Sequence, residues 1–325
     1  MTVAFIKLHV AGNDYILIDE DRRGHEFLQN GNSPRSLIAT LILDRRTGVG
    51  ASACVYIHRS SGPGSQEQRI FARAYQSDGA EKALAPDSLL CIARYCFDLA
   101  YHTDGYISIE TGYPQADTYR LEIIDSRSFL ITLPYPDMQP LTLLIDGQTA
   151  YAYQIRFFQH QYTVALAFST TFSETGTHYK AGPGPKRIRQ ALLAMQKHPA
   201  GSEQSQPASI PLVVRCIGKD TVRYLGPEPT DRIEGAAAAV LAAGFHGFIV
   251  HSYQTQGNQP VLAEWRGRGG AVSYASFPSF TTNATSLSST TLIDRGRFYV
   301  TADRQRDRLT IVGKAEYCFD GNFDV

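Results

Sequence analysis

The chain has 325 residues and a mass of 35.9 kDa, and at about 150 residues per domain this length predicts two domains. Hydrophobic residues make up 43% and charged residues 19%, a composition typical of folded proteins and not of disordered ones. The 31 basic and 31 acidic residues cancel, so the net charge gives no electrostatic reason to expect a nucleic-acid or membrane partner.

The five cysteines are an odd number and lack CxxC spacing, which indicates reduced thiols and neither a disulfide framework nor a zinc cluster. No motif predicts a metal site. The N-terminal segment alternates apolar and polar residues around Lys7, unlike a signal peptide. The longest uncharged apolar stretch, 235–250, is shorter than the ~20 residues of a spanning helix. We therefore expect a cytoplasmic protein.

Strands and helices alternate in the first third of the chain. Short segments rich in β-branched and aromatic residues predict strands at 3–9, 15–19, 54–58, 69–75, 106–110 and 119–124. Helices are predicted over 34–44 and 86–101. The second has Pro86 at its first position, where the missing N–H does no harm, and is apolar on nearly every side. Such a helix is enclosed by protein.

The second half repeats this scheme. Strand patterns occur at 152–158, 162–168, 212–217, 297–302 and 309–312. One amphipathic helix begins at Lys186, and an alanine-rich helix over 234–245 lets strands approach it closely. Proline, glycine and serine predict loops at 177–187 and 198–211, and 273–291 is predicted as a loop or an irregular edge strand. Because both halves combine strands, an acidic turn and a buried helix, we expect a pseudo-duplicated α+β protein with a cleft between the halves.

Four segments resemble the diaminopimelate epimerases, a family of two-domain, cofactor-independent amino-acid racemases and epimerases. They are FIKLHVAGNDYILID (5–19), LDRRTGVGASACVYI (43–57), RIFARAYQSDGAEKALAPDSLLCIARY (69–95) and LTIVGKAEYCFDG (309–321). The resemblance implies two pseudo-symmetric domains, 1–133 and 134–308, with 309–325 packing back onto the first. Each domain would be a curved, mostly antiparallel sheet wrapped around a central buried helix, with the active-site cleft between the two.

The two catalytic thiols of that family have no counterpart at the matching positions. Ala85 stands in the place of the first, and Glu234, or Ile233 in an ungapped alignment, stands in the place of the second. Diaminopimelate epimerisation is therefore not expected. By resemblance, the substrate-binding candidates are Asn13, Gln76, Ala85, Ser88, His160 and Tyr162.

Three carboxylates are the candidate catalytic groups: Glu81, Asp87 and Glu234. Glu81 has the offset from the helix at which the related phenazine-biosynthesis isomerases carry their acid/base glutamate. A buried carboxylate beside a cleft can have its pKa raised toward the range that acid/base catalysis needs. The alternative is structural, since carboxylates also bond turn amides and stabilise the first turn of a helix.

The predicted function is that of a cofactor-independent isomerase, epimerase-like or cyclising enzyme that uses carboxylates on a small, activated organic substrate. The alternative is a non-catalytic relative that binds a small molecule or a protein partner through the same cleft. We expect no cofactor and no metal, and neither a nucleic acid nor a membrane as a partner. A homodimer is compatible with the sequence.

Overall fold

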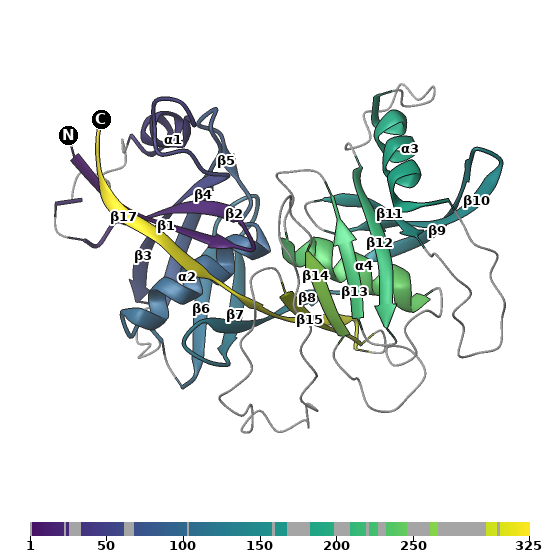
Figure 1. Ribbon diagram of the computed structural model, residues 1–325. Coiled ribbons are helices and arrows are strands. Elements are labelled where there is room, and N and C mark those ends of the chain that lie inside the picture. The colour runs from purple at the N-terminus through teal and green to yellow at the C-terminus, as the bar shows by residue number, and fades with distance from the viewer. Residues whose placement is uncertain are drawn as a thin grey trace. The chain divides into compact units, whose positions relative to one another are not determined.

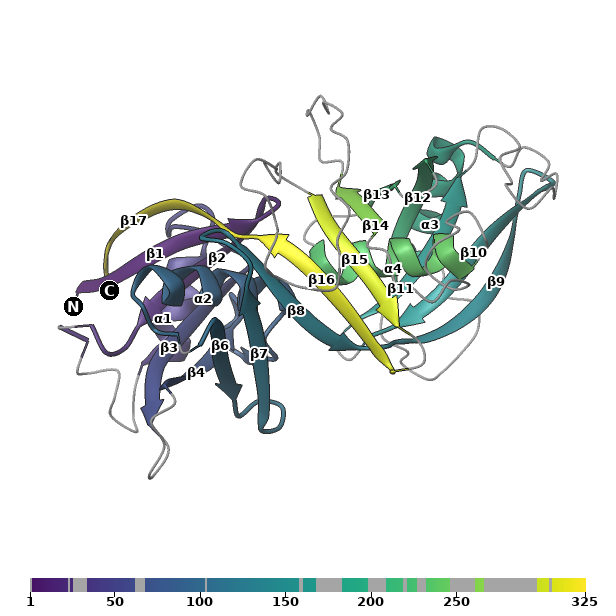
Figure 2. The ribbon, with the colours of Figure 1, turned by 90° about the horizontal axis from the view of Figure 1, so that it is seen from below.

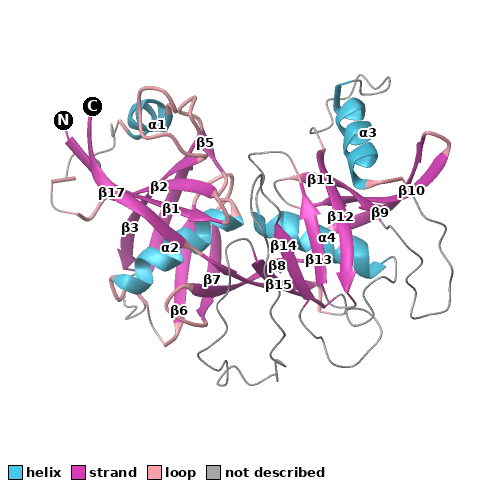
Figure 3. Cartoon of the chain, in the orientation of Figure 1, coloured by secondary structure: helices cyan, strands magenta, loops and turns pink. Residues whose placement is uncertain are grey.

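The computed structural model describes residues 2–22, 24–25, 34–61, 68–102, 104–157, 160–167, 183–197, 209–218, 221–226, 232–245, 261–265, 297–303 and 306–325. The chain forms two compact units. The N-terminal unit consists of Met1–Ile131 and Val312–Val325, and the C-terminal unit of Thr132–Ile311. Within the described residues, both are built mainly from strands (Figures 1 and 3), and each contains two helices.

The sheet of the N-terminal unit has the strand order β17–β1–β2–β3–β4–β6–β7–β8, and β5 also pairs with β4. The pairs β2–β3 and β4–β6 are parallel and the others antiparallel. The bounds are β1 (Thr2–Val10), β2 (Asn13–Asp19), β3 (Ala53–Ser61), β4 (Gln68–Tyr75), β5 (Glu81–Lys82), β6 (Tyr106–Thr111), β7 (Asp117–Ile123), β8 (Ser128–Pro134) and β17 (Glu316–Asp324).

Helices α1 (Arg35–Leu43) and α2 (Pro86–Asp98) lie in the crossover connections of the two parallel pairs. Helix α2 contacts β1, β2 and β6, and ten of its residues are buried. This confirms the enclosed helix that the apolar pattern predicted. It ends three residues earlier than predicted, since Ala100 adopts a left-handed conformation (φ 56°) that no helix continues.

The two ends of the chain belong to the same unit. Strand β17 pairs antiparallel with β1 from Thr2↔Asp324 to His9↔Glu316. Figure 2 shows the yellow β17 running beside the purple β1. The closing strand is therefore part of the sheet around α2.

The C-terminal unit repeats this arrangement in the order β9–β10–β11–β12–β13–β14–β15, with β11–β12 and β13–β14 parallel. Its helices α3 (Pro185–Lys197) and α4 (Arg232–Phe245) lie in the crossovers of the parallel pairs. The bounds of the strands are β9 (Asp137–Ile145), β10 (Gln148–Arg156), β11 (Gln161–Ala167), β12 (Ile210–Gly218), β13 (Thr221–Leu225), β14 (Val261–Trp265), β15 (Arg297–Asp303) and β16 (Arg308–Lys314).

The pairing pattern shows that the second unit repeats the first. In each unit an antiparallel hairpin is followed by a helical crossover to a strand that pairs parallel with the hairpin's second strand. That strand begins a second antiparallel hairpin, and a second helical crossover leads to another parallel neighbour. Helix α4 therefore corresponds to α2, and β11 to β2. The alanines of α4 are fully buried, and the helix contacts every strand from β10 to β15.

Some predicted boundaries were wrong, and several strands were not predicted at all. Helix α3 begins at Pro185 inside the predicted loop 177–187, because proline suits the first turn of a helix. Strand β12 begins at Ile210, inside the predicted loop 198–211. The predicted segment 273–291 lies outside the described residues. The strands that sequence patterns missed are β5, β8, β9, β13 and β14. Among the described residues, no helix is both long and apolar enough to cross a membrane.

Candidate functional site

A histidine and a buried glutamate meet at the start of the central helix of the C-terminal unit. Glu234 lies in the first turn of α4, and His160 directly precedes β11. The Nδ1 atom of His160 is 2.7 Å from Oε2 of Glu234. Glu234 is only 3% exposed, whereas 31% of the His160 side chain is accessible. The pair thus combines the imidazole ring of His160, which is partly accessible to solvent, with a carboxylate that is shielded from water.

The hydroxyl of Tyr162 donates a second hydrogen bond to Oε2 of Glu234, at 3.1 Å. Tyr162 is fully buried and its ring packs edge-on against those of His160 and Phe157. The ring of His160 therefore contacts Glu234 at Nδ1 and packs against the ring of Tyr162. This is the arrangement by which a carboxylate orients a histidine for acid/base chemistry.

The N-terminal unit has the corresponding pair at the start of α2. Asn13, the first residue of β2, donates from Nδ2 to Oδ2 of Asp87 at 2.8 Å and to the hydroxyl of Tyr15 at 2.8 Å. Its Oδ1 accepts from Ser52 at 2.7 Å. Asn13 is 5% exposed and Asp87 is completely buried. Both amide hydrogens of Asn13 are thus engaged by protein groups.

The remaining substrate-binding candidates of the N-terminal unit are Ala85 and Ser88, at the start of α2, and Gln76, in a turn before β5. Ala85 is the residue that precedes the helix, with extended backbone angles, and it is buried. The Ser88 hydroxyl donates to the carbonyl oxygen of Ala85 at 2.6 Å, inside the same turn. Gln76 is exposed and opens the tight turn that Gly79, with its positive φ of 81°, closes.

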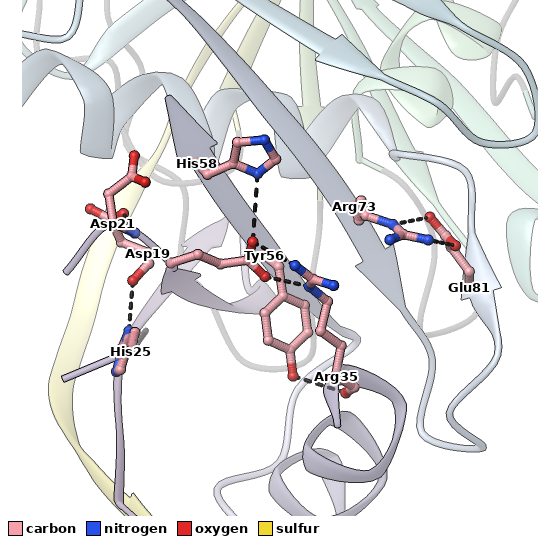
Figure 4. Close-up of polar contacts among 9 residues, drawn as sticks. Asp19, Asp21, His25, Arg35, Tyr56, His58, Arg73 and Glu81 are labelled. Carbon is pink, nitrogen blue, oxygen red and sulfur yellow. Dashed lines mark hydrogen bonds and ion pairs between the residues drawn. The ribbon is translucent and has the colours of Figure 1, made fainter. Parts of the chain in front are cut away.

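Glu81 lies on β5 and forms an ion pair with Arg73 of the neighbouring β4. Both carboxylate oxygens are engaged, at 2.8 Å from Nε and 2.7 Å from Nη2 (Figure 4). The hydrogen bond to Glu81 raises the pKa of the Arg73 guanidinium, an effect that burial opposes. This two-point contact is typical of a structural ion pair. Its catalytic role stays a prediction.

A second ionic cluster on the same sheet was missed by sequence analysis. Arg35 of α1 contacts Glu20 through both Nε and Nη2, and His58 of β3 lies 3.5 Å from the same carboxylate. The backbone of Arg35 also accepts a hydrogen bond from Tyr56 (Figure 4). Burial raises the pKa of Glu20, but the bonds from Arg35 and His58 outweigh it and hold the pKa below its usual value. The contacts tie α1 to the sheet.

The cysteines whose side chains are described lie away from the two helix starts. Cys54 is in β3, Cys91 and Cys96 are inside α2, and all three are buried, whereas Cys318 in β17 is exposed. Burial raises the pKa of Cys54 to about 12 and also raises the pKa of Cys91 and Cys96. These three thiols are therefore poor nucleophiles. Nor does any group of three possible metal-ligating side chains occur within the described part of the chain.

Sequence analysis named His160, Tyr162 and Glu234 separately but did not predict that they meet. An equal spacing in the two halves of the sequence could have predicted the contact. His160 and Glu234 are 74 positions apart, and so are Asn13 and Asp87. In an internally repeated fold, such matching intervals place equivalent residues at equivalent sites. Tyr15 and Ser52, which complete the N-terminal cluster, carried no such signal.

No protein-family model matches the sequence. Among curated proteins, diaminopimelate epimerase from Archaeoglobus fulgidus is 31% identical over 101 residues, which is 31% of this chain and 33% of that protein. The enzyme of the same name from Carboxydothermus hydrogenoformans is 27% identical over 136 residues, 42% of this chain and 45% of that protein. The chain thus matches less than half of the length of these relatives.

Solved structures match over nearly the whole chain. A phenazine biosynthesis protein of the PhzF family from Enterococcus faecalis superposes with a TM-score of 0.55, at 11% identity and full coverage of both chains. A hydroxyproline epimerase from Agrobacterium vitis, with bound trans-4-hydroxy-L-proline, gives 0.53 at 12% identity and covers 99% of this chain and 91% of its own. The chain therefore has the fold of the diaminopimelate epimerases and their phenazine-biosynthesis and proline-epimerase relatives.

Proposed function

We propose that the chain is a cofactor-independent isomerase in which His160 transfers a proton on a small, activated organic substrate. The observation that carries this proposal is the contact between the accessible His160 and the buried Glu234 at the start of α4. The fold supports it, because similar structures are named as epimerases and isomerases, among them a methylitaconate-delta-isomerase.

The chemistry follows from the two ring nitrogens of His160. When Glu234 is ionised, Nδ1–H donates to its Oε2, and this leaves a lone pair on Nε2. Nε2 can then take a proton from carbon, and the buried carboxylate stabilises the imidazolium that forms. The same nitrogen returns the proton later in the cycle. Tyr162 holds Glu234 in place through its hydrogen bond to Oε2.

An imidazole is a weak base toward carbon, so the substrate must carry an acidified C–H bond. A carbonyl or a conjugated double bond next to that carbon supplies the necessary stabilisation of negative charge. The predicted carboxylate catalysis is thereby refined, with Glu234 acting through His160. Asp87 is completely buried beside Asn13 and has no comparable route to a ligand.

The test is proton exchange with solvent in the absence of any added cofactor. The purified chain is incubated in deuterium oxide with L-proline, trans-4-hydroxy-L-proline, LL-diaminopimelate and cyclohex-3-en-1-one, and deuterium uptake is followed by mass spectrometry. We expect uptake into at least one compound, and a loss of about 100-fold in His160→Gln, the usual magnitude for an acid/base group.

His58→Gln is the matched control, because His58 is also half-exposed and lies beside a buried glutamate, Glu20. It should exchange at the wild-type rate. Uptake that is equal in the wild type and in His160→Gln would contradict the proposal. Binding of a compound without any exchange would instead favour the non-catalytic alternative.

A further inference from the structure

The first turn of α4 is bonded to two strands of the C-terminal sheet. The hydroxyl of Tyr162, on β11, reaches the side chain of Glu234, and the hydroxyl of Tyr224, on β13, reaches the backbone. Tyr224 donates to the carbonyl oxygen of Arg232, the first residue of the helix, at 2.8 Å. We infer that Tyr224 is a positioning residue, whose hydroxyl places this turn so that Glu234 meets Nδ1 of His160. Its part in the reaction rests on the proposed function.

Strand β13 is a firm support for this contact. It pairs antiparallel with β12 and parallel with β14, and helix α4 lies against it (Figure 1). Tyr224 is completely buried and Arg232 is only 2% exposed, so water does not compete for the hydrogen bond between them. In such surroundings a hydrogen bond is stronger than in water, and it is directional. The helix start is therefore tied to an interior strand of the sheet.

The side chains that follow Glu234 hold the helix less firmly. Positions 236–239 are all alanine and all fully buried. Helices pack by fitting ridges of side chains into grooves, and ridges made of alanine are shallow. Helix α2 differs at this point, because the bulkier Leu89 and Leu90 follow its own carboxylate, Asp87. The hydroxyl of a buried tyrosine thus supplies positional definition to α4 that its alanines supply only in part.

The contact between Glu234 and His160 is sensitive to small movements of this turn. Arg232 and Glu234 are two positions apart in one helical turn, so a displacement of the Arg232 carbonyl carries Glu234 with it. The distance from Nδ1 to Oε2 is 2.7 Å, and a displacement of about 1 Å would take it out of hydrogen-bond range. With that bond weakened, the proton of the neutral ring would move toward Nε2, the nitrogen that has to accept a proton from the substrate.

The N-terminal unit offers a matched control. The hydroxyl of Tyr56 donates to the carbonyl oxygen of Arg35, the first residue of α1, at 2.9 Å. Tyr56 is 1% exposed, so the two tyrosines are equally buried. Tyr56→Phe therefore removes the same kind of bond at the start of a helix that does not carry Glu234.

The experiment compares Tyr224→Phe and Tyr56→Phe with the wild type, as full chains, and its first readout is the tautomer of His160. Nitrogen NMR, assigned with His160→Gln and recorded at the alkaline plateau of the ring shifts, gives the ratio of the Nε2–H to the Nδ1–H form. We expect Tyr224→Phe to raise this ratio about 5-fold, the factor that one ordinary hydrogen bond is worth, and Tyr56→Phe to leave it unchanged. Urea unfolding should show both variants folded, with similar losses of stability.

Proton exchange is the second readout. Deuterium uptake is measured on whichever of L-proline, trans-4-hydroxy-L-proline, LL-diaminopimelate and cyclohex-3-en-1-one the wild type exchanges fastest. Tyr224→Phe should slow uptake about 5-fold, and Tyr56→Phe should not slow it. In a chain that already carries Glu234→Gln, adding Tyr224→Phe should cause no further slowing, because Tyr224 acts through that carboxylate.

The failures can be told apart. An unchanged tautomer ratio in Tyr224→Phe would overturn the inference, whatever the exchange rates are. An equal change of the ratio in Tyr56→Phe would also overturn it, because the effect would then be one of general stability. So would an equal slowing by Tyr224→Phe with and without Glu234→Gln. If uptake by the wild type does not depend on His160, the proposed function fails, while the tautomer ratio still decides whether Tyr224 positions the pair.

Discussion

The Nδ1 atom of His160 lies 2.7 Å from Oε2 of Glu234, across 74 positions of sequence, in a contact that Asn13 and Asp87 repeat at 2.8 Å in the other unit. The repeat keeps the geometry and changes the chemistry. An imidazole has a ring nitrogen that can accept a proton, whereas the amide of an asparagine serves as neither an acid nor a base. The two units therefore offer one candidate proton-transfer group and one structural contact.

Glu234→Gln should slow proton exchange by about 100-fold or more, since the amide keeps the shape of the side chain but cannot stabilise an imidazolium by charge. Stability should change by less than about 1 kcal/mol, because a buried charge is removed together with its attraction to His160. Exchange rates by mass spectrometry and urea unfolding measure the two effects. Tyr162→Phe, which retains the carboxylate, should slow exchange less than Glu234→Gln does. The opposite order would contradict the role of the carboxylate.

Asn13→Ala should destabilise the chain by about 3 kcal/mol, because it removes hydrogen bonds to three buried or half-buried partners. Ser52→Ala is the matched control. It removes the short bond to the same amide and a longer one to Asp14, and should cost about 1 kcal/mol. Equal losses in urea unfolding would show that the contact with Asp87 contributes little.

The Glu20 cluster should make stability depend on pH. Because hydrogen bonds from Arg35 and His58 lower the pKa of Glu20 despite its burial, its contribution is present above the pKa of the unfolded chain and is lost as pH falls through the folded value. The free energy of unfolding should therefore fall between about pH 5 and pH 3, and the fall should be smaller in Glu20→Gln. Urea unfolding at both pH values tests this. An equal loss of unfolding free energy between about pH 5 and pH 3 in the wild type and in Glu20→Gln would refute it.

The thiols should not take part in the reaction. Iodoacetamide should alkylate the exposed Cys318 of the native protein first, while Cys54, Cys91 and Cys96 react only after unfolding, since burial raises the pKa of each of the three. Peptide mapping by mass spectrometry gives the order of labelling. Loss of proton exchange that accompanies alkylation of Cys91 would mean that a thiol performs the chemistry.

The sequence predicted the fold better than the site. Apolar periodicity located α2 and α4, because a buried helix must be apolar on all sides, and the resemblance in the first hundred residues supplied the architecture. Short or weakly alternating strands such as β5 and β9 were missed, since their burial depends on neighbours that are distant in sequence.

The contact between His160 and Glu234 could not be derived from local pattern, because it depends on how β11 packs against α4. From the sequence, both Glu234 and Glu81 are candidate catalytic carboxylates. The structure separates them by their partners, a histidine for one and an arginine for the other. A side chain's chemistry depends on such partners, and they become visible only in three dimensions.

The most direct test of the account is the tautomer of His160. Nitrogen NMR of the ring, assigned with His160→Gln and recorded over a pH series up to the alkaline plateau of its shifts, distinguishes a proton on Nδ1 from one on Nε2. We expect a proton on Nδ1 in the wild type, donated to Glu234, with Nε2 unprotonated, and a shift of the population toward Nε2–H in Glu234→Gln. A wild-type ring with its proton on Nε2 would contradict the claim that Glu234 prepares His160 to accept a proton from a substrate.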